Sequence, residues 1–261
     1  MADKETVETY DGMAERWTEI RRGGEVLGHS RVERPAMLRR LPDVRGKDVL
    51  CLGCGSSDEC QLMLDRGAAR VTGVDASEGL LALARQETPG AEFVLGDLDD
   101  LDLGAEKFDF IWASLALHYA SDFENLLSRM AGLLRDGGKV LFSLPHPVYY
   151  GAQRKREGKV RQVLLGFERD DGDLRLYGDC LNERLVSERL HGEFPVSFHI
   201  RSIGATVEAL LEAGFVILGV DEPQAEPILS NDDSDARAFV RRHQVIPLVV
   251  VLFAVKPSLA H

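Results

Sequence analysis

The chain has 261 residues, 44% of them apolar and 28% charged, which is an ordinary composition for a globular protein with a sizeable core. Its formal net charge of −12 disfavours non-specific binding to nucleic acid, because an acidic surface repels phosphate backbones. No apolar signal-peptide segment opens the chain, and the longest apolar run, residues 246–255, falls well short of the roughly 20 residues of a membrane span. We therefore expect a cytoplasmic protein with no membrane partner.

Segments of strand and helix character alternate along the chain, which predicts an α/β fold with a mostly parallel sheet. Residues 48–53 are the first expected strand, 70–75 the second, and 91–100 contain the third, ending near Asp97. Ser77 is placed to cap the helix after the second strand. Residues 108–117 and 139–145 are the fourth and fifth strands, and the helix between them is expected to end at Gly137 and Gly138.

Residues 146–200 break this pattern, since they are charged, contain scattered aromatic residues and lack the alternation of strand and helix. After them, residues 202–215 predict an amphipathic helix, and 216–223 and 247–257 predict two further strands. Seven strands with one insertion favour a single domain over residues 1–261 rather than two domains. Within it we expect a helical segment at 1–45 and an inserted cap over the substrate at 146–200.

The four cysteines, Cys51, Cys54, Cys60 and Cys180, do not predict a metal site. Cys51 and Cys54 have C-x-x-C spacing, but they straddle a strand end and a turn, and no second pair stands at zinc-like spacing. We expect reduced cysteines that serve packing, as in a reducing compartment, and no bound metal.

A glycine turn, Gly53-Cys54-Gly55, follows the first strand and predicts a ligand site. Dinucleotide sites use G-x-G-x-x-G, but here Ser56, Ser57 and Asp58 follow, so the third glycine is missing. No G-K-[S/T] follows either, which excludes a Walker loop. A bare tight turn is the alternative interpretation.

Two acidic residues at successive strand ends favour a nucleoside over a pyrophosphate as the ligand. Asp75 stands 20 residues after Gly55, where a carboxylate binds ribose hydroxyls, and Asp97 follows at the end of the third strand. Capping of a turn or a helix is the alternative role for both.

The segments VLCLGCGSS, VTGVDAS, GDLDDL, FDFIWASLALHY and LLRDGGKVLFSLPHP occur in this order. Together they resemble the class I S-adenosylmethionine-dependent methyltransferases, in particular the small-molecule branch with the ubiquinone- and biotin-pathway enzymes. The resemblance covers about residues 48–147 and returns at 199–215. It implies a Rossmann-like sheet of seven mostly parallel strands flanked by helices, S-adenosylmethionine as cofactor and S-adenosylhomocysteine as product.

The same resemblance implies where the cofactor contacts lie. Gly53 and Gly55 would face its methionine part, Asp75 would bind the ribose, and the backbone around Ser114 would hold the amino group. The other implied contacts are Ala113 beside Ser114, Asp97 and Leu98 at the adenine, Ala76 against the adenine face, and Tyr10 and Trp17 above the cofactor. Packing into the core is the alternative for the two aromatic residues.

Two positions depart from the family pattern. Cys51 stands where the family usually has an acidic residue, which could pair with the cofactor's ammonium group, and Ser57 stands at the third glycine position. Asp58 or Glu59 could supply the missing negative charge.

The chemistry expected of such a site is an in-line displacement, so the protein mainly has to align the nucleophile with the methyl group and sulfur. A base is needed only if the acceptor carries a proton at the working pH. His118 after the fourth strand and His146 after the fifth are the candidate catalytic residues, with a structural role as the alternative for each.

Substrate selection is expected from the insertion, because the cofactor motifs lie outside it. The candidate substrate contacts are Tyr119, Tyr149, His199 and Arg201. A basic run at residues 154–161 could hold a carboxylate or phosphate, but the acidic residues near it favour a solvated loop.

Methyl transfer to oxygen, nitrogen or carbon of a small-molecule substrate is the function that these features favour. The alternative is a protein that binds S-adenosylmethionine or S-adenosylhomocysteine without transferring methyl groups. The missing third glycine disfavours a nicotinamide-dependent oxidoreductase. Methylation of nucleic acid is disfavoured because Ala113-Ser114-Leu115-Ala116 stands where base-amino methyltransferases carry Asn/Asp-Pro-Pro-aromatic.

Overall fold

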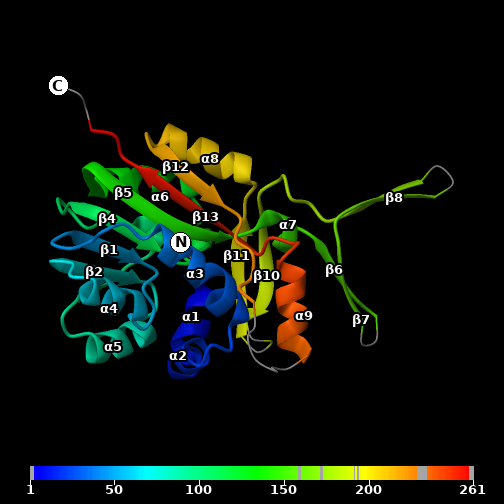
Figure 1. Ribbon diagram of the computed structural model, residues 1–261, viewed down its shortest axis with the longest axis horizontal. Coiled ribbons are helices and arrows are strands. Elements are labelled where there is room, and N and C mark those ends of the chain that lie inside the picture. The colour runs from blue at the N-terminus through cyan, green and yellow to red at the C-terminus, as the bar shows by residue number, and fades with distance from the viewer. Residues whose placement is uncertain are drawn as a thin grey trace.

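The computed structural model describes residues 3–157, 160–170, 173–190, 192, 194–227 and 234–258. At its centre is a seven-stranded sheet in the order β12-β13-β5-β4-β1-β2-β3 (Figure 1). The neighbouring strands from β5 through β4, β1 and β2 to β3 all pair in parallel. Strand β13 runs antiparallel to both of its neighbours, β5 and β12. The predicted Rossmann-like α/β sheet is confirmed.

The sheet strands are β1 (Asp48–Leu52), β2 (Arg70–Asp75), β3 (Glu92–Leu95), β4 (Phe108–Ala113), β5 (Leu134–Pro145), β12 (Val216–Asp221) and β13 (Val249–Val255). The α-helices outside the insertion are α1 (Lys4–Gly12), α2 (Ala14–Arg22), α3 (Arg34–Arg40), α4 (Asp58–Asp65), α5 (Glu78–Glu87), α6 (Phe123–Leu133), α8 (Ile203–Glu212) and α9 (Ser234–His243). A π-helical turn, η1 (His29–Glu33), precedes α3, and two 3-10 turns, η2 (Leu98–Asp100) and η3 (Leu117–Tyr119), follow β3 and β4.

Both faces of the sheet are buried at its central strands, because alternate residues of these strands enter different hydrophobic clusters. In β1, Leu50 and Leu52 pack with α6 and α8, whereas Val49 and Cys51 pack with α3, α4 and α5. Side chains of a strand alternate between the two faces of a sheet, so a continuous apolar run is what a sheet covered on both sides requires. The sheet is thus the middle of three layers (Figure 1).

Helix α6 ends earlier than the sequence suggests. It stops at Leu133, and Leu134 is already extended, with φ −82° and ψ 142°, because it pairs with Phe108 of β4. The register between β4 and β5 then shifts, and Gly137 lies in the irregular part of β5 with φ +76°. The glycine therefore serves a bulged strand rather than a helix terminus, and the expected end of α6 was wrong.

The insertion after β5 is made of a short helix and three antiparallel hairpins. These elements are α7 (Pro147–Tyr150), β6 (Gln153–Glu157), β7 (Val160–Leu164), β8 (Gly166–Asp170), β9 (Asp173–Tyr177), β10 (Arg184–Leu190) and β11 (Phe194–Ile200). The hairpins β6–β7 and β8–β9 extend away from the body, whereas β10–β11 lies against it (Figure 1). Of the three hairpins, β10–β11 is therefore the one that packs against the body, and the described part of β6–β7 meets the body only where β6 begins.

The N-terminal helices close over the edge of the sheet at which the parallel strands end. Ser197 of β11 donates its backbone N–H to Thr6 Oγ1 at 2.9 Å. On the other side, Asp11 accepts from Ser77 Oγ at 2.6 Å and from the Gly79 N–H at 2.9 Å. Helix α1 thus contacts the insertion at one end and α5 at the other, and it covers the strand ends.

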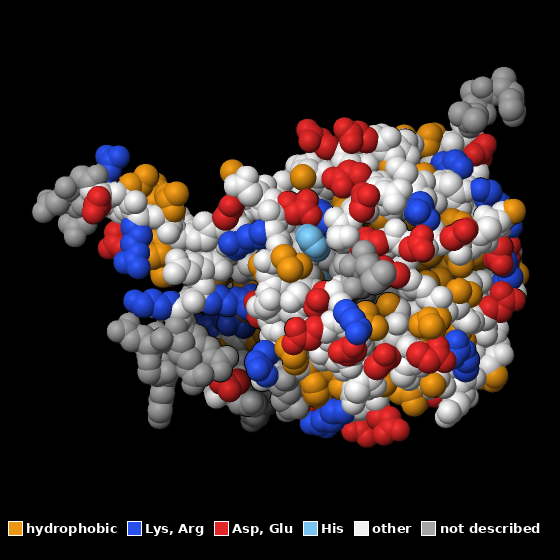
Figure 2. Space-filling model, turned by 180° about the vertical axis from the view of Figure 1, so that it is seen from behind, with side chains coloured by type: hydrophobic (Ala, Val, Ile, Leu, Met, Phe, Trp, Pro, Cys, Tyr) orange, Lys and Arg blue, Asp and Glu red, His pale blue; other side chains and the backbone are white. Residues whose placement is uncertain are grey.

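The rear face of the molecule carries acidic side chains spread widely over the body, while lysine and arginine side chains gather near the protruding hairpins (Figure 2). Within the described residues, no helix has the length and apolar character needed to cross a membrane.

Candidate active site

The glycine turn after β1 has a backbone conformation and a packing that require glycine. Gly53 and Gly55 have φ of +62° and +52°, a region that favours glycine. A Cβ on Gly53 would lie 2.3 Å from the Cβ of Ala116, on the loop after β4. The turn therefore has no room for a side chain at this position.

Asp75, at the end of β2, holds this turn. Its Oδ2 accepts the N–H of Gly55 at 2.8 Å, and its Oδ1 accepts the N–H of Ser77 at 2.9 Å. Burial raises the pKa of Asp75 above its ordinary value, and the backbone N–H donors of Ser77 and Gly55 oppose this effect. Each carboxylate oxygen has a second lone pair, so the group can also accept bonds from ligand hydroxyls.

Ser57 keeps the glycine-like conformation of the position it occupies. Its φ is +82°, its side chain is buried, and its Oγ lies 2.7 Å from Thr88 Oγ1. The hydrogen bond to Thr88 stabilises a serine that the backbone conformation disfavours, and no ligand contact is needed to explain it.

We expect Ser57→Ala to be less stable than Ser57→Gly. Both variants lose the bond to Thr88, but only alanine keeps a Cβ at positive φ, which costs about 1–2 kcal/mol. Urea unfolding followed by circular dichroism measures this difference. Equal stability of the two variants would show that the turn is not strained.

A cavity of about 390 Å³ opens over the glycine turn and Asp75. Of the site residues expected from the sequence, those that line it are Tyr10, Trp17, Gly53, Gly55, Asp75, Ala76, Leu98, Ser114, His118, Tyr119 and Tyr149. The cavity thus brings together residues from the N-terminal helices, four strand ends and the insertion.

The other expected site residues lie outside this lining. Asp97 caps η2 by accepting the Asp99 N–H at 2.9 Å, and Ala113 is fully buried within β4. His146 is also buried, its Nε2 lies 2.6 Å from Glu222 Oε1, and its Nδ1 accepts the Val148 N–H. These contacts give His146 a structural role at the start of α7.

His199 and Arg201 border a second, much smaller cavity of about 10 Å³. Arg201 is buried, donates to the Ala120 carbonyl at 2.9 Å and lies 2.7 Å from Glu183 Oε1. His118 borders both cavities. His199 and Arg201 therefore reach the large cavity through His118 rather than directly.

His118 is a neutral group in the cavity wall. Burial, and next to it the charge of Arg201, lowers its pKa to about 3. Its Nδ1 is buried and meets no hydrogen-bond partner in the described part of the chain. The ring can accept or donate a hydrogen bond at physiological pH, but it is a weak base.

An aromatic wall lines the same cavity as the glycine turn. Tyr119 and Tyr150 pack edge-on against Phe198 of β11, with ring centroids 6.2 and 5.6 Å apart. The hydroxyls of Tyr10 and Tyr119 are 2.8 Å apart, and burial raises the pKa of Tyr10 to about 12. This part of the cavity is apolar and its phenols stay protonated.

Arg154 is the member of the basic run that the structure places at the cavity. It lies over the rings of Tyr149 and Tyr150, at 5.0 and 5.3 Å from their centroids, and pairs with Glu188. Arg154 is exposed, as the expected solvated face requires, but it lies in strand β6 rather than in a loop and also borders the cavity. Lys159 of the same run lies outside the described residues.

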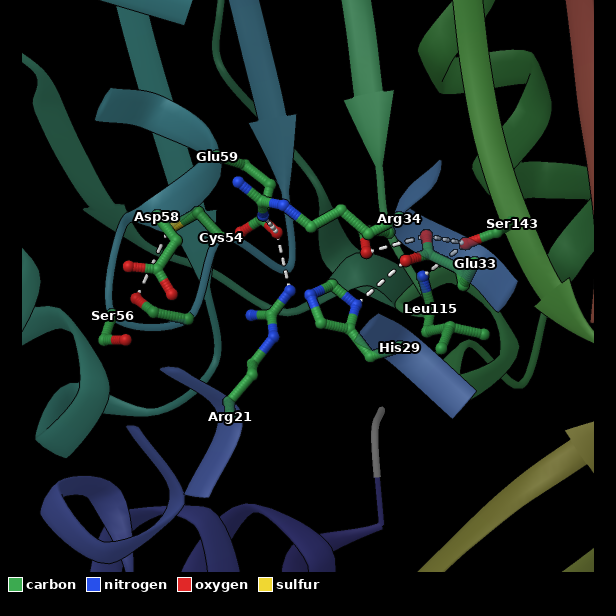
Figure 3. Close-up of polar contacts among 12 residues, drawn as sticks. Arg21, His29, Glu33, Arg34, Cys54, Ser56, Asp58, Glu59, Leu115 and Ser143 are labelled. Carbon is green, nitrogen blue, oxygen red and sulfur yellow. Dashed lines mark hydrogen bonds and ion pairs between the residues drawn. The ribbon is translucent and has the colours of Figure 1, made fainter. Parts of the chain in front are cut away.

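Arg21 and His29 also line the cavity, and sequence reasoning missed both. Arg21 is on α2, and its Nη1 lies 3.7 Å from the place where a Cβ on Gly55 would be. His29 is on η1 and faces Glu33 (Figure 3). No motif surrounds either residue, so only the packing of the N-terminal helices onto the strand ends reveals them.

The two acids expected to replace the charge missing at Cys51 are already paired. Asp58 accepts from Arg22 at 2.8 Å, and Glu59 accepts from Arg21 at 2.6 Å (Figure 3). Cys51 itself is buried and packs in the cluster under α3 and α4. None of the three is placed to face a ligand with an unpaired negative charge.

Comparison with known proteins agrees with this geometry. Residues 50–142, from β1 to β5, match the methyltransferase domain family. A crystal structure of an S-adenosylmethionine-dependent methyltransferase from Mesorhizobium loti is 30% identical, with a TM-score of 0.67 over 85% of this chain and 97% of that chain. The chain belongs to the S-adenosylmethionine-dependent methyltransferases.

Two curated proteins are similar to this chain in sequence. An uncharacterized protein of Haemophilus influenzae is 31% identical over 206 residues, which are 74% of this chain and 76% of that protein. A trans-aconitate 2-methyltransferase of Delftia acidovorans is 35% identical over 117 residues, 43% of this chain and 44% of the relative. The second match spans less than half of either protein.

Proposed function

We propose that this methyltransferase transfers the methyl group of S-adenosylmethionine to a small-molecule acceptor enclosed in the same cavity. The supporting observation is that one cavity joins the glycine turn and Asp75 to the aromatic wall of η3, α7 and β11. Cofactor and acceptor then share one space, which favours alignment of the reacting atoms.

The residues present fit the cofactor. Gly53 and Gly55 line the cavity without side chains, and a Cβ on Gly53 would clash with Ala116 in the same wall. Asp75 keeps lone pairs free for ribose hydroxyls. In our proposal the methionine part lies over the glycine turn, the adenine lies between Ala76 and Leu98, and Arg21 holds the carboxylate. When bound, the cofactor supplies an electrophilic methyl group on a sulfonium.

The acceptor is proposed to lie against the aromatic wall, with β10–β11 as its cap. Tyr119, Tyr150 and Phe198 supply apolar surface for a flat or unsaturated body, and Arg154 supplies positive charge at the insertion. The Delftia relative acts, by its name, on trans-aconitate. Small organic acids are therefore the first acceptors to test.

His118 is proposed to position the acceptor by a hydrogen bond rather than to remove its proton. It borders the cavity at the carboxyl end of β4, and its low pKa makes it a poor base. We expect His118→Ala to lower kcat about tenfold or more, with the affinity for S-adenosylhomocysteine unchanged within twofold. Because the ring is neutral, the wild-type rate should show no inflection from His118 between pH 5 and 8.

Steady-state kinetics with the identified acceptor, together with calorimetric titration of S-adenosylhomocysteine, measures both effects. Full activity of His118→Ala would remove the residue from the catalytic machinery. Native mass spectrometry of the purified protein identifies what binds: we expect S-adenosylhomocysteine or S-adenosylmethionine, and a second small molecule when the acceptor is retained. Capture of NAD in their place would contradict the proposed function.

A further inference from the structure

A carboxylate is buried directly behind the cavity wall. Glu33, at the end of the π-helical turn η1, is fully buried. Its Oε1 accepts from Ser114 Oγ at 2.9 Å and from Ser143 Oγ at 2.7 Å, and its Oε2 lies 2.9 Å from His29 Nδ1 (Figure 3). Single π-helical turns inside helical segments occur frequently at functional sites.

This carboxylate is negatively charged, yet it lacks a strong cationic partner. Burial acts to raise the pKa of Glu33, but His29 and the hydroxyls of Ser143 and Ser114 bring it below its ordinary value. Among the ion pairs of the described residues, Glu33 meets only His29. A buried charge is unfavourable unless it is paired, so the site favours a ligand that brings a positive charge.

His29 connects Glu33 to the cavity. Because the carboxylate accepts the hydrogen bond, Nδ1 carries a proton. In the neutral form of the ring, Nε2 is then an acceptor. In Figure 3 this second ring nitrogen points away from Glu33, toward the side on which Arg21 lies, and His29 lines the cavity. The imidazole of His29 thus lies between the buried carboxylate of Glu33 and the cavity.

Two groups of opposite charge lie near the glycine turn: Arg21 in the cavity wall, and the carboxylate of Glu33 behind His29. Arg21 lies beside Gly55, whereas Ser114, which donates to Glu33, lies at the end of β4. A zwitterionic amino-acid group presents a carboxylate and an ammonium a few bonds apart. This pair of opposite charges is complementary to such a group.

We propose that Glu33 and His29 bind the ammonium group of the cofactor's methionine part and replace the acidic residue that is absent at Cys51. The inference rests on the cofactor placement proposed above. His29 Nε2 accepts the ammonium N–H, and Glu33 both fixes the ring and supplies the negative charge. The pair positions the cofactor and takes no part in the transfer itself.

Calorimetric titration of the full chain with three probes tests this assignment. S-adenosylhomocysteine has both charged groups, its deaminated analogue keeps only the carboxylate, and 5′-methylthioadenosine has neither. We expect Glu33→Gln and His29→Gln to weaken S-adenosylhomocysteine about tenfold or more, with the other two probes changed less than twofold. The double variant should lose no more than about either single variant, because the two residues act as one unit.

Arg21→Gln is the matched variant, since it lies at the same end of the cavity but faces the carboxylate. It should weaken S-adenosylhomocysteine and the deaminated analogue alike and leave 5′-methylthioadenosine unchanged. Thermal unfolding of each variant reports whether Glu33→Gln folds, and His29→Gln, at the cavity surface, stands in for it if it does not.

An equal loss for all three probes would assign Glu33 and His29 to the structure alone and overturn the inference. Unchanged affinity for S-adenosylhomocysteine would place the ammonium elsewhere, with the same consequence. If wild-type protein failed to bind S-adenosylhomocysteine at all, the cofactor placement itself would be wrong. Failure of the inference and failure of the proposed function are therefore distinct results.

Discussion

Gly53→Ala is expected to weaken S-adenosylhomocysteine binding by roughly 30-fold or more. The new Cβ would lie 2.3 Å from the Cβ of Ala116, which is attached directly to the backbone and cannot rotate away. A side chain at positive φ costs about 1–2 kcal/mol, and overpacking a filled space costs about 1–3 kcal/mol. Because Ala116 lines the cavity, relief of the clash must displace the ligand-facing loop after β4.

Gly104→Ala is the control, because it separates backbone strain from the clash. Gly104 has φ +61°, almost the same as Gly53, but a Cβ there would meet nothing within 4 Å. It should lower the free energy of unfolding by about 1–2 kcal/mol and leave cofactor affinity unchanged. Calorimetry and urea unfolding of both variants measure the contrast. Gly53→Ala with wild-type affinity would mean that the turn does not hold the ligand.

Asp75→Asn is expected to lower affinity for S-adenosylhomocysteine by roughly 100-fold. The carboxylate accepts from the N–H groups of Gly55 and Ser77, and the amide of asparagine cannot accept from both with its single oxygen. The variant also loses the charged acceptor for ribose hydroxyls, and hydrogen bonds to charged groups contribute about 1.5–3 kcal/mol each. Isothermal titration at pH 7.5 measures the loss.

The pH dependence of binding provides a second measurement on the same residue. Burial raises the pKa of Asp75, and ribose hydroxyls that donate to the ionised form would lower it again when the ligand binds. Affinity should therefore be full above the raised pKa and fall as the pH drops through it. Asp75→Asn should remove this component of the pH dependence.

Asp99→Asn is the matched control for Asp75. Asp99 also accepts backbone N–H groups at a loop, those of Ser121 and Asp122, but it lies outside the cavity lining. It should reduce stability and leave ligand affinity unchanged. If the two variants bound S-adenosylhomocysteine equally well, Asp75 would be a purely structural cap.

The strand ends could be located from the sequence because local signals mark them. Asp75 follows an apolar run, and Ser77 caps α5 by accepting the Leu80 N–H, as the sequence predicts. Where a local signal conflicts with strand pairing, pairing decides the structure. Gly137 resembles a helix terminator, yet the pairing of Leu134 with β4 ends α6 first.

The cavity lining was only partly predictable for the same reason. Residues that directly follow β1, β2 and β4 were found, because these strand ends lie at one edge of the sheet. Arg21, His29 and Glu33 come from helices whose place over that edge is set by tertiary contacts such as Thr6 to Ser197 and Asp11 to Ser77. No local pattern in residues 4–33 encodes those contacts.

Asp97 shows the opposite case, a local signal without a role in the cavity lining. It stands at the end of β3, but its side chain turns to the Asp99 N–H and caps η2. Capping was one of the two roles that the sequence left open for Asp97, and this contact is a cap. Leu98, one residue further, does line the cavity.

The central claim is that this chain methylates a small molecule bound beside the cofactor. The direct measurement is incubation with methyl-labelled S-adenosylmethionine and a small-molecule extract of cells, followed by separation of label by molecular mass. We expect formation of S-adenosylhomocysteine and label in a low-mass compound, with both lost in Asp75→Asn. Label recovered only on protein or nucleic acid, or tight cofactor binding without any S-adenosylhomocysteine formed, would contradict the claim.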